Sequence, residues 1–157
     1  QVNMTEARRS AGRAGVMKEM DEDSMIVFSP EGEAKHTVTV FTDIDCPYCR
    51  KLHQEVGKMN EMGIAVRYMA YPRAGVGSAS YDKAVSVWCA DDRQEAMSTA
   101  KNGGKVEPSS CENPVKQHMA MGEKVGVRGT PAIFLEDGRM LPGYVPAERL
   151  AKILEQE

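Results

Sequence analysis

The sequence lacks the features that mark nucleic-acid-binding and membrane-spanning proteins. Its 157 residues carry 20 basic and 23 acidic side chains, which gives a net charge of −3. A nucleic-acid-binding domain usually shows a basic stripe or a strongly basic isoelectric point instead. No apolar run approaches the roughly 18 to 20 residues that a membrane-spanning helix needs. We therefore expect a chain that neither binds nucleic acid nor crosses a bilayer.

Cysteine is also scarce, and its spacing argues against a structural zinc site. The four cysteines form one close pair and one distant pair: Cys46 with Cys49, and Cys89 with Cys111. A zinc site of the common type needs a second close pair of ligands, and the three histidines do not supply one at helical spacing. We expect neither a metal nor another cofactor. The two pairs are spaced so differently that we expect different roles for them.

The apolar pattern predicts a single domain of α/β class, since this length suits one domain. Alternating, β-branched segments predict strands, and apolar residues at helical spacing predict helices. The strands are expected at residues 25–28, 36–42, 64–70, 132–136 and 139–143, and the helices at residues 47–62, 81–89, 92–101, from Pro114 onward and from Pro146 onward. This order is that of a thioredoxin-like fold with an all-helical insertion at about residues 78–126.

The N-terminal segment is more polar than the rest. Residues 3–23 predict a helix whose apolar edge, at Ala7, Ala11, Ala14 and Met17, is too narrow to form a core by itself. We interpret residues 1–24 as a linker helix that precedes a catalytic domain at residues 25–157.

The close pair occupies a position that favours redox chemistry. Cys46 follows a predicted strand directly and precedes the helix that Pro47 opens. A cysteine at a helix N-terminus is stabilised as the reactive thiolate by free N–H groups and the helix dipole. Cys46 is thus the expected nucleophile, and Cys49, one turn later, is the expected resolving thiol. Pro47 and Tyr48 between them are expected to tune the redox potential.

Two aspects of this pair stay open in the sequence. The acids Asp43 and Asp45 would raise the thiol pKa, whereas Arg50 and Lys51 would lower it, and the balance is not readable. An inert structural disulfide is an alternative to a redox pair, although so short a loop at a helix start favours a labile bond. The nearby His53 is interpreted as a polar surface histidine rather than a catalytic base.

The distant pair predicts a structural disulfide. Cys89 lies on the apolar face of a predicted helix and Cys111 precedes the next helix, so a bridge would hold the helical insertion together. Two buried free thiols are the alternative. A structural disulfide would argue for an oxidising compartment.

The segment Gly129-Thr130-Pro131 precedes a predicted strand. A proline at a strand start donates no ladder hydrogen bond, and the bond before it is able to adopt the cis form. In a thioredoxin-like order of elements, this segment falls where the fold places its cis-proline loop, opposite the active cysteine. We therefore expect a functional role for Thr130 and Pro131.

Taken together, the motifs resemble the catalytic domain of DsbC, the bacterial periplasmic protein-disulfide isomerase, over about residues 25–155. The segments that carry the resemblance are VFTDIDCPYCRKLH, IAVRYMAYPR, VWCADD, GVRGTPAIFLEDG and LPGYVPAE. The resemblance implies that Cys46 attacks wrongly paired disulfides of misfolded periplasmic proteins and that Cys49 resolves the intermediate. It also implies that the segment Thr130-Pro131 contacts the bound substrate chain and that a DsbD-type membrane reductant keeps the pair reduced.

The chain departs from the DsbC pattern at two points. The dipeptide between the cysteines is Pro47-Tyr48, whereas DsbC usually carries Gly-Tyr and Pro-Tyr is typical of its relative DsbG. A dithiol oxidase, or a DsbG-like reductase or chaperone, is therefore the alternative function. Members of the family also carry an N-terminal dimerisation domain, and only a segment similar to its linker helix is present. We expect a homodimer for the full-length protein and a largely monomeric state for this piece.

Overall fold

The computed structural model describes residues 4–155, and its centre is a five-stranded sheet in the order β1-β3-β2-β4-β5. The strands are β1 (Ile26–Phe28), β2 (His36–Thr42), β3 (Ile64–Ala70), β4 (Ala132–Phe134) and β5 (Met140–Pro142). Only the β2–β3 pairing is parallel; the other three pairings are antiparallel. The predicted α/β thioredoxin-like class is confirmed. Expectations for residues 1–3 and 156–157 lie outside the described residues.

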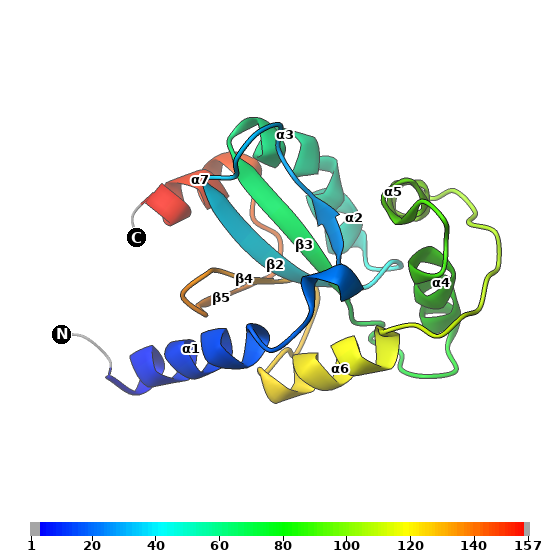
Figure 1. The fold of residues 1–157 in the computed structure, drawn as a ribbon, viewed down its shortest axis with the longest axis horizontal. Coiled ribbons are helices and arrows are strands. Elements are labelled where there is room, and N and C mark those ends of the chain that lie inside the picture. The colour runs from blue at the N-terminus through cyan, green and yellow to red at the C-terminus, as the bar shows by residue number, and fades with distance from the viewer. Residues whose placement is uncertain (1–3, 156–157) are drawn as a thin grey trace.

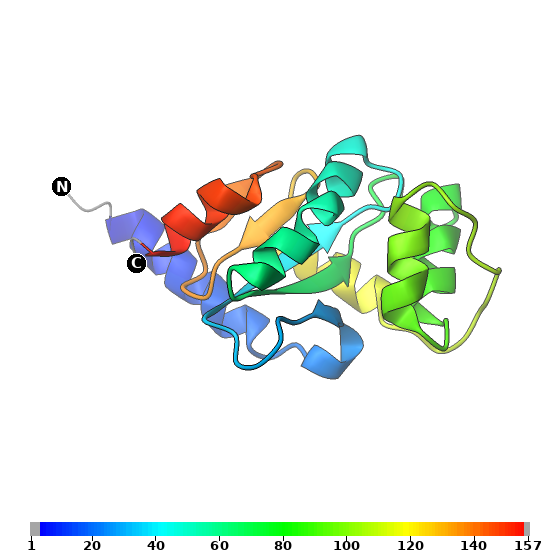
Figure 2. The same ribbon diagram turned by 90° about the horizontal axis from the view of Figure 1, so that it is seen from above.

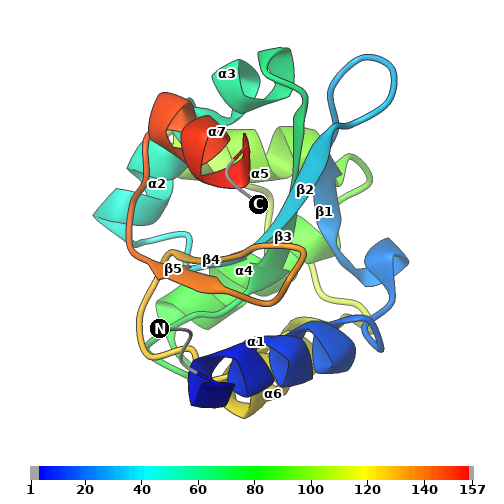
Figure 3. The ribbon, with the colours of Figure 1, turned by 90° about the vertical axis from the view of Figure 1, so that its left-hand side faces the viewer.

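Helices cover both faces of this sheet, as Figures 1 and 3 show. On one face lie α2 (Pro47–Gln54), α3 (Val56–Glu61) and α7 (Ala147–Glu155), and on the other lie α1 (Met4–Met17) and α6 (Val115–Lys124). The central strand β2 is buried between them. Val38 and Val40 belong to the core on the α2 side, whereas Phe41 belongs to the core on the α1 side. Alternation along the strand thus distributes its side chains between two cores.

The helix predicted at residues 47–62 is interrupted in the structure. It divides at Glu55, whose N–H donates to the carbonyl of Leu52, three residues back rather than four. The Glu55 carboxylate accepts a hydrogen bond of 3.1 Å from the backbone N–H of Ala147, at the start of α7. The apolar pattern alone did not reveal this break, because the contact depends on a segment more than ninety positions away.

The helical block consists of α4 (Ala79–Trp88), α5 (Arg93–Lys101) and α6, and Figure 2 shows α4 and α5 packed side by side at one end of the sheet. Ser78 and Asp92 cap α4 and α5 through their side-chain oxygens. The predicted start of α6 at Pro114 is wrong by one residue. The helix begins at Val115, whose N–H donates to Oδ1 of Asn113 at 3.1 Å.

The N-terminal helix α1 packs on the turn between β4 and β5. A Cβ atom on Gly138, which has φ +87°, would lie 1.8 Å from the carbonyl oxygen of Ser10. Arg13 Nε donates to the Gly138 carbonyl at 2.9 Å. The predicted apolar edge is only partly correct, because Ala11 is exposed whereas Ser10 is buried. The close backbone approach decides which face of α1 is covered.

Candidate active site

The close cysteine pair lies at the junction between β2 and α2. Cys46 is the N-cap residue of α2, with extended backbone angles, and Pro47 occupies the first helical position. Proline lacks an N–H, but a first-turn N–H has no partner within the helix, so no helical hydrogen bond is lost. The N–H groups of Tyr48 and Cys49 point back to the Cys46 side chain. The sulfur lies where a capping oxygen lies in other helices, but the thiol makes no side-chain capping hydrogen bond.

Cys46 is held in a state that favours its thiolate. Burial by itself raises the pKa of this thiol, because it penalises the charged form, and the residue is only 1% exposed. The Thr130 side chain and the backbone N–H groups of Cys49 and Tyr48 are placed to stabilise the thiolate, and together they outweigh burial, so the pKa of Cys46 lies below its ordinary value. A lowered pKa increases the thiolate fraction at neutral pH, which is the nucleophilic form.

Cys49 lies deeper and behaves in the opposite way. It is fully buried, and burial raises the pKa of its thiol above the ordinary value. The positive charge of Lys101 and hydrogen bonds from Asp43, Thr130 and Thr42 oppose this rise without cancelling it. Both cysteines are free thiols in the structure. At neutral pH, one sulfur of the pair is therefore poised to attack while the other stays protonated.

Tertiary structure brings the Thr130–Pro131 segment against this pair. The Thr130–Pro131 peptide bond is cis, and Cys46 Sγ donates to the carbonyl oxygen of Thr130 at 3.4 Å. The Thr130 hydroxyl is buried and has no hydrogen-bond partner among the described residues in this thiol form. It lies close enough to both sulfurs to lower the pKa of each. The carbonyl of Thr130 thus accepts a hydrogen bond from the thiol form of Cys46, and its hydroxyl is placed to stabilise the thiolate form.

The dipeptide between the cysteines faces outward. Pro47 is exposed, and Tyr48 has an exposed fraction of 62%, which makes it one of two large apolar side chains left uncovered in the described part of the chain. Pro47 and Tyr48 are therefore exposed beside the two buried cysteines, and the cis-proline segment packs against Cys46.

The charged neighbours named in the sequence pair with other groups. Asp43 is buried and accepts from Arg73 Nε at 3.1 Å, while Asp45 accepts from Lys83 Nζ at 2.7 Å. Arg50 Nε donates to a backbone carbonyl at 3.0 Å, and Lys51 Nζ lies 4.7 Å from the centre of the Tyr144 ring. Each of these four charged side chains therefore contacts a group other than the Cys46 sulfur. Burial and hydrogen bonds, rather than the expected charge balance, set the pKa of Cys46.

His53 is not the surface histidine that the sequence predicted. Its side chain is buried, with Nδ1 at 2.8 Å from the Tyr68 hydroxyl and Nε2 at 3.0 Å from Ser98 Oγ. Burial and the nearby Lys101 charge lower its pKa to about 4. Both ring nitrogens are engaged, so His53 is a neutral structural group at neutral pH.

Sequence reasoning missed Lys101, which lies beside the cysteine pair. Its side chain is only 2% exposed, although it is on α5 and Lys is rarely buried. Its Nζ donates to the hydroxyl of Thr42, the last residue of β2. The spacing contained a signal, because Met97 and Lys101 lie four residues apart and Met97 is on the buried face of α5.

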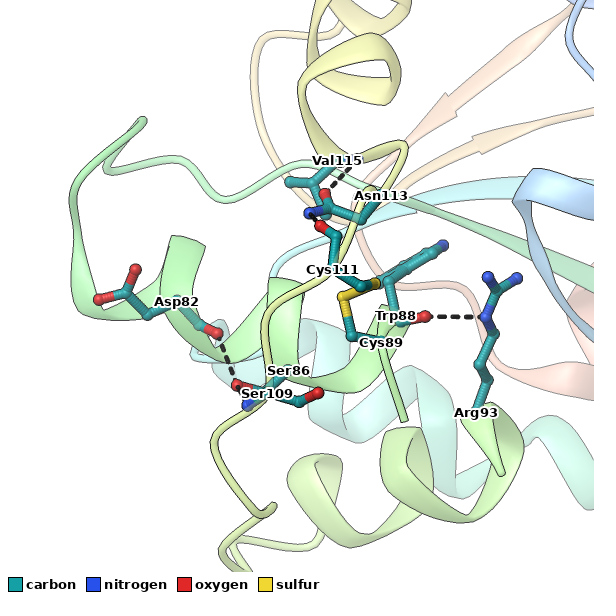
Figure 4. The surroundings of a disulfide bond; sticks show 9 residues. All are labelled: Asp82, Ser86, Trp88, Cys89, Arg93, Ser109, Cys111, Asn113 and Val115. Carbon is teal, nitrogen blue, oxygen red and sulfur yellow. Dashed lines mark hydrogen bonds between the residues drawn. A yellow bond between two sulfur atoms is a disulfide. The ribbon is translucent and has the colours of Figure 1, made fainter. Parts of the chain in front are cut away.

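The distant cysteines are joined in a disulfide, shown in Figure 4. Cys89 is the C-cap residue of α4, and Cys111 lies in the loop before α6. A hydrogen bond of 3.2 Å from the Ser109 N–H to Ser86 Oγ adds a second link between α4 and this loop. The alternative of two buried free thiols does not hold, since Cys111 is exposed and bonded.

The arrangement of residues 4–155 also bears on metal binding and on membrane crossing. No group of three or more His, Cys, Asp or Glu side chains in this range is arranged to hold a metal ion. No helix in the same range combines the length and apolar character that a bilayer crossing requires.

Comparison with known proteins agrees with the geometry of the cysteine site. The family model described as a thioredoxin-like domain matches residues 22–157. The thiol:disulfide interchange protein DsbC of Dickeya dadantii (strain 3937) is 44% identical over 134 residues, which cover 85% of this chain and 56% of the relative. DsbC of Escherichia coli (strain K12) is 42% identical over 135 residues, with 86% and 57% covered.

A solved structure supports the same conclusion. The crystal structure of a disulfide interchange protein from Neisseria gonorrhoeae is 34% identical and has a TM-score of 0.76, with 87% of this chain and 97% of that chain covered. The chain spans little more than half the length of the two DsbC relatives named above. The family model covers most of the chain, and the Neisseria protein is matched over nearly its whole length. The chain therefore belongs to the thioredoxin-like domain family, among the DsbC-type thiol:disulfide interchange proteins.

Proposed function

We propose that this chain is the catalytic domain of a periplasmic protein-disulfide isomerase, and that Cys46 and Cys49 carry the reaction. One observation supports this above all others. Two free thiols share one helix start, yet the pKa of Cys46 is lowered by hydrogen bonds and the pKa of Cys49 is raised by burial. An inert structural pair would not need this difference, whereas sequential attack and resolution require it.

The reaction begins when the Cys46 thiolate attacks one sulfur of a wrongly paired substrate disulfide. A bond forms between Cys46 and that sulfur, and the second substrate sulfur leaves as a thiolate. If this thiolate attacks a different disulfide of the substrate, Cys46 is released in a later step and the substrate has been isomerised. If Cys49 attacks Cys46 instead, the substrate leaves with two thiols. The enzyme pair is oxidised by two electrons and becomes the Cys46–Cys49 disulfide.

The substrate chain is proposed to bind across Thr130, Pro131 and Tyr48. Thr130 and Pro131 lie against Cys46, and Tyr48 exposes an apolar ring beside it. An unfolded chain that carries a wrong disulfide also exposes apolar side chains, which suits such a surface. Binding here would bring the substrate sulfur to the N-terminus of α2, where the N–H groups of the first turn stabilise the attacking thiolate.

The remaining parts of the proposal concern the cellular setting. Misfolded disulfide-containing proteins would be the substrates, and a DsbD-type membrane reductant would return the Cys46–Cys49 disulfide to two thiols. The Cys89–Cys111 disulfide supports an oxidising compartment such as the periplasm. We also propose that α1 belongs to a linker which joins this domain to a dimerisation domain in the full-length homodimer.

Refolding of a substrate protein with scrambled disulfides tests the proposed function. The wild-type chain is expected to restore native pairing in a glutathione buffer. The Cys46→Ala variant is expected to be inactive, because it lacks the nucleophile. The Cys49→Ala variant is expected to retain reshuffling but to accumulate mixed disulfides with the substrate. Equal refolding by wild type and Cys46→Ala would overturn the proposal.

A dithiol oxidase or a DsbG-like reductase or chaperone is the second candidate, and the Pro47-Tyr48 dipeptide favours the DsbG-like form. The test compares wild type with Pro47→Gly in equilibrium with glutathione. Oxidation of a reduced substrate without reshuffling would favour the oxidase. Suppression of substrate aggregation by both wild type and Cys46→Ala would favour the chaperone.

A further inference from the structure

Lys101 is the charged group that the proposed function leaves unexplained. It lies on the apolar face of α5 with Ala96, Met97 and Ala100, and its side chain is almost fully buried. No carboxylate in the described part of the chain lies within ion-pair distance of it. Burial of an unpaired ammonium group is unfavourable, so such a lysine needs a specific environment to be retained.

The Lys101 amino group contacts a residue that lies between it and the cysteine pair. Its Nζ donates to Thr42 Oγ1, and it lies 5.1 Å from the centre of the Tyr68 ring. The same Thr42 hydroxyl lies close enough to the Cys49 sulfur to act on its thiolate form and lower its pKa. Thr42 thus stands between the amino group and the resolving sulfur.

A hydroxyl group is able to connect these two groups in either protonation state, because it has one donor and two acceptor positions. When Lys101 is an ammonium and Cys49 a thiolate, Lys101 donates to Thr42, and Thr42 donates to the sulfur. When Lys101 is an amine and Cys49 a thiol, the sulfur donates to Thr42, and Thr42 donates to the amine. The two arrangements differ only in which end of the chain holds the proton.

Other groups near Cys49 are less suited to accept its proton. His53 has both ring nitrogens engaged, by Tyr68 and Ser98. Asp43 accepts three hydrogen bonds, from the N–H of Asp45 and from the backbone N–H and Nε of Arg73. The titratable and charged groups that surround Lys101 are Cys46, Cys49, Asp43, Arg50, His53 and Tyr68.

We infer that Lys101 is a positioning residue for the resolving step, and that its amino group holds the proton which leaves Cys49 through the Thr42 hydroxyl. This inference deepens the proposed function and rests on it. In the mixed disulfide, the Cys49 proton passes to the Lys101 amine, and the resulting Cys49 thiolate attacks Cys46 Sγ. The Cys46–Cys49 bond forms, the bond from Cys46 to the substrate sulfur breaks, and the substrate leaves as a thiolate that solvent protonates.

The protonation behaviour of Lys101 supports this role. Burial lowers the pKa of its ammonium group to about 8, although the nearby Cys49, Cys46 and Asp43 charges oppose the shift. An amino group with such a pKa is present in both forms near neutral pH and can both accept and release a proton. An ordinary exposed lysine stays protonated there.

The experiment separates the two steps with a symmetric aromatic disulfide whose thiolate is coloured. Attack by Cys46 releases the first coloured thiolate, and resolution by Cys49 releases the second. In the wild type, the rate of the second release is expected to rise with pH and to level off near pH 8. In Lys101→Met, the second release is expected to slow about tenfold at neutral pH, the effect of one pKa unit on the thiolate fraction, and to keep rising above pH 8.

Two variants of Thr42 test the same inference while Lys101 itself is left unchanged. Thr42→Val keeps the shape but removes the hydroxyl, and its second release is expected to slow as in Lys101→Met. Thr42→Ser keeps the hydroxyl and is expected to restore most of the rate. Lys152→Met, which removes an exposed charge on α7, is the control for net charge.

The outcomes distinguish this inference from the proposed function. If the wild type releases no coloured thiolate, the proposed redox function fails. If the wild type completes both releases, and both Lys101→Met and Thr42→Val resolve at the wild-type rate and with its pH profile, only the role of Lys101 is overturned. A slowed first release with an unchanged second release would also overturn it, because that result would mean that the Lys101 charge acts on the attack by Cys46 and not on resolution by Cys49.

Discussion

Cys46 Sγ lies 3.4 Å from the carbonyl oxygen of Thr130, a residue 84 positions further along the chain. The contact joins the start of α2 to the segment before β4, and it places the Thr130 hydroxyl beside both sulfurs of the pair. One threonine thereby influences the pKa of the proposed nucleophile and that of the proposed resolving thiol.

The first prediction concerns this hydroxyl. Thr130→Val is expected to raise the pKa of Cys46 by about one to two units, because a hydrogen bond to a charged group contributes roughly 1.5–3 kcal/mol. Thiolate absorbance in the ultraviolet, recorded against pH in a Cys49→Ala background, measures the change. Thr130→Ser keeps the hydroxyl and is expected to titrate like its parent. An unchanged titration of Thr130→Val would show that the backbone N–H groups alone stabilise the thiolate.

The second prediction concerns the Cys89–Cys111 disulfide. Its removal in the double variant Cys89→Ala/Cys111→Ala is expected to lower the free energy of unfolding by about 3 kcal/mol, since the bridge joins two residues that are 22 positions apart in the sequence. Denaturant titration measures the loss. The thiolate titration of Cys46 is expected to stay unchanged, because the bridge lies within the helical block. A loss below about 1 kcal/mol would contradict the assigned structural role.

The third prediction is a loss of stability in acid that depends on buried histidines. Burial lowers the pKa of His118 to about 4, and its Nδ1 accepts from the Ala70 N–H at 3.0 Å, so it cannot be protonated without breaking that bond. The unfolded chain takes up the proton near pH 6.5 and the folded chain only near pH 4. Stability contributed by neutral His118 is therefore present above about pH 6.5 and is lost as pH falls toward 4.

The size of this effect is about 3 kcal/mol for His118, and a similar loss is expected for His53, whose pKa is also about 4. Unfolding free energies at several pH values measure the slope. His118→Gln keeps an acceptor near Ala70 but cannot titrate, so its stability is expected to depend less on pH than that of the wild type. Parallel pH profiles for the two proteins would disprove the assignment.

The fourth prediction tests how α1 docks on the domain. Gly138→Ala is expected to displace α1, because the new Cβ would lie 1.8 Å from the Ser10 carbonyl oxygen. Gly126→Ala is the matched control, since Gly126 has a similar φ of +90° but a Cβ added there would meet no atoms within 4 Å. Both variants carry the strain of a left-handed residue, about 1–2 kcal/mol.

Limited proteolysis of α1 and thermal unfolding measure the difference between the two glycine variants. Only Gly138→Ala is expected to release α1 to rapid cleavage. Equal cleavage of both variants would mean that α1 does not depend on this close approach.

Much of the fold followed from local patterns. The bounds of β2 and β3 were predicted correctly at residues 36–42 and 64–70, because long buried strands of β-branched residues have a clear pattern. The order of elements was enough for the α/β thioredoxin-like class. The position of Cys46 before Pro47 was equally local, since strand end, N-cap and first-turn proline are adjacent in sequence.

Other features needed the folded chain. Glu55, where the helix is interrupted, is hydrogen-bonded to Ala147, and the buried His53 contacts Tyr68 and Ser98; none of these partners is close in sequence. The pKa order of the two thiols likewise depends on depth and on Thr130, whereas the sequence offered only the nearby charges. Burial and long-range hydrogen bonds set these properties, and neither is visible in a linear pattern.

The sequence by itself determined the order of the elements and which two cysteines stand at a helix start, because both follow from local spacing and backbone preference. Only the tertiary structure decided what surrounds those cysteines. It brought Thr130 to the Cys46 sulfur from 84 positions away, and it buried Lys101 of the helical block behind Thr42. Desolvation and hydrogen bonding act through space, so the chemistry of the pair depends on residues that the sequence places far away.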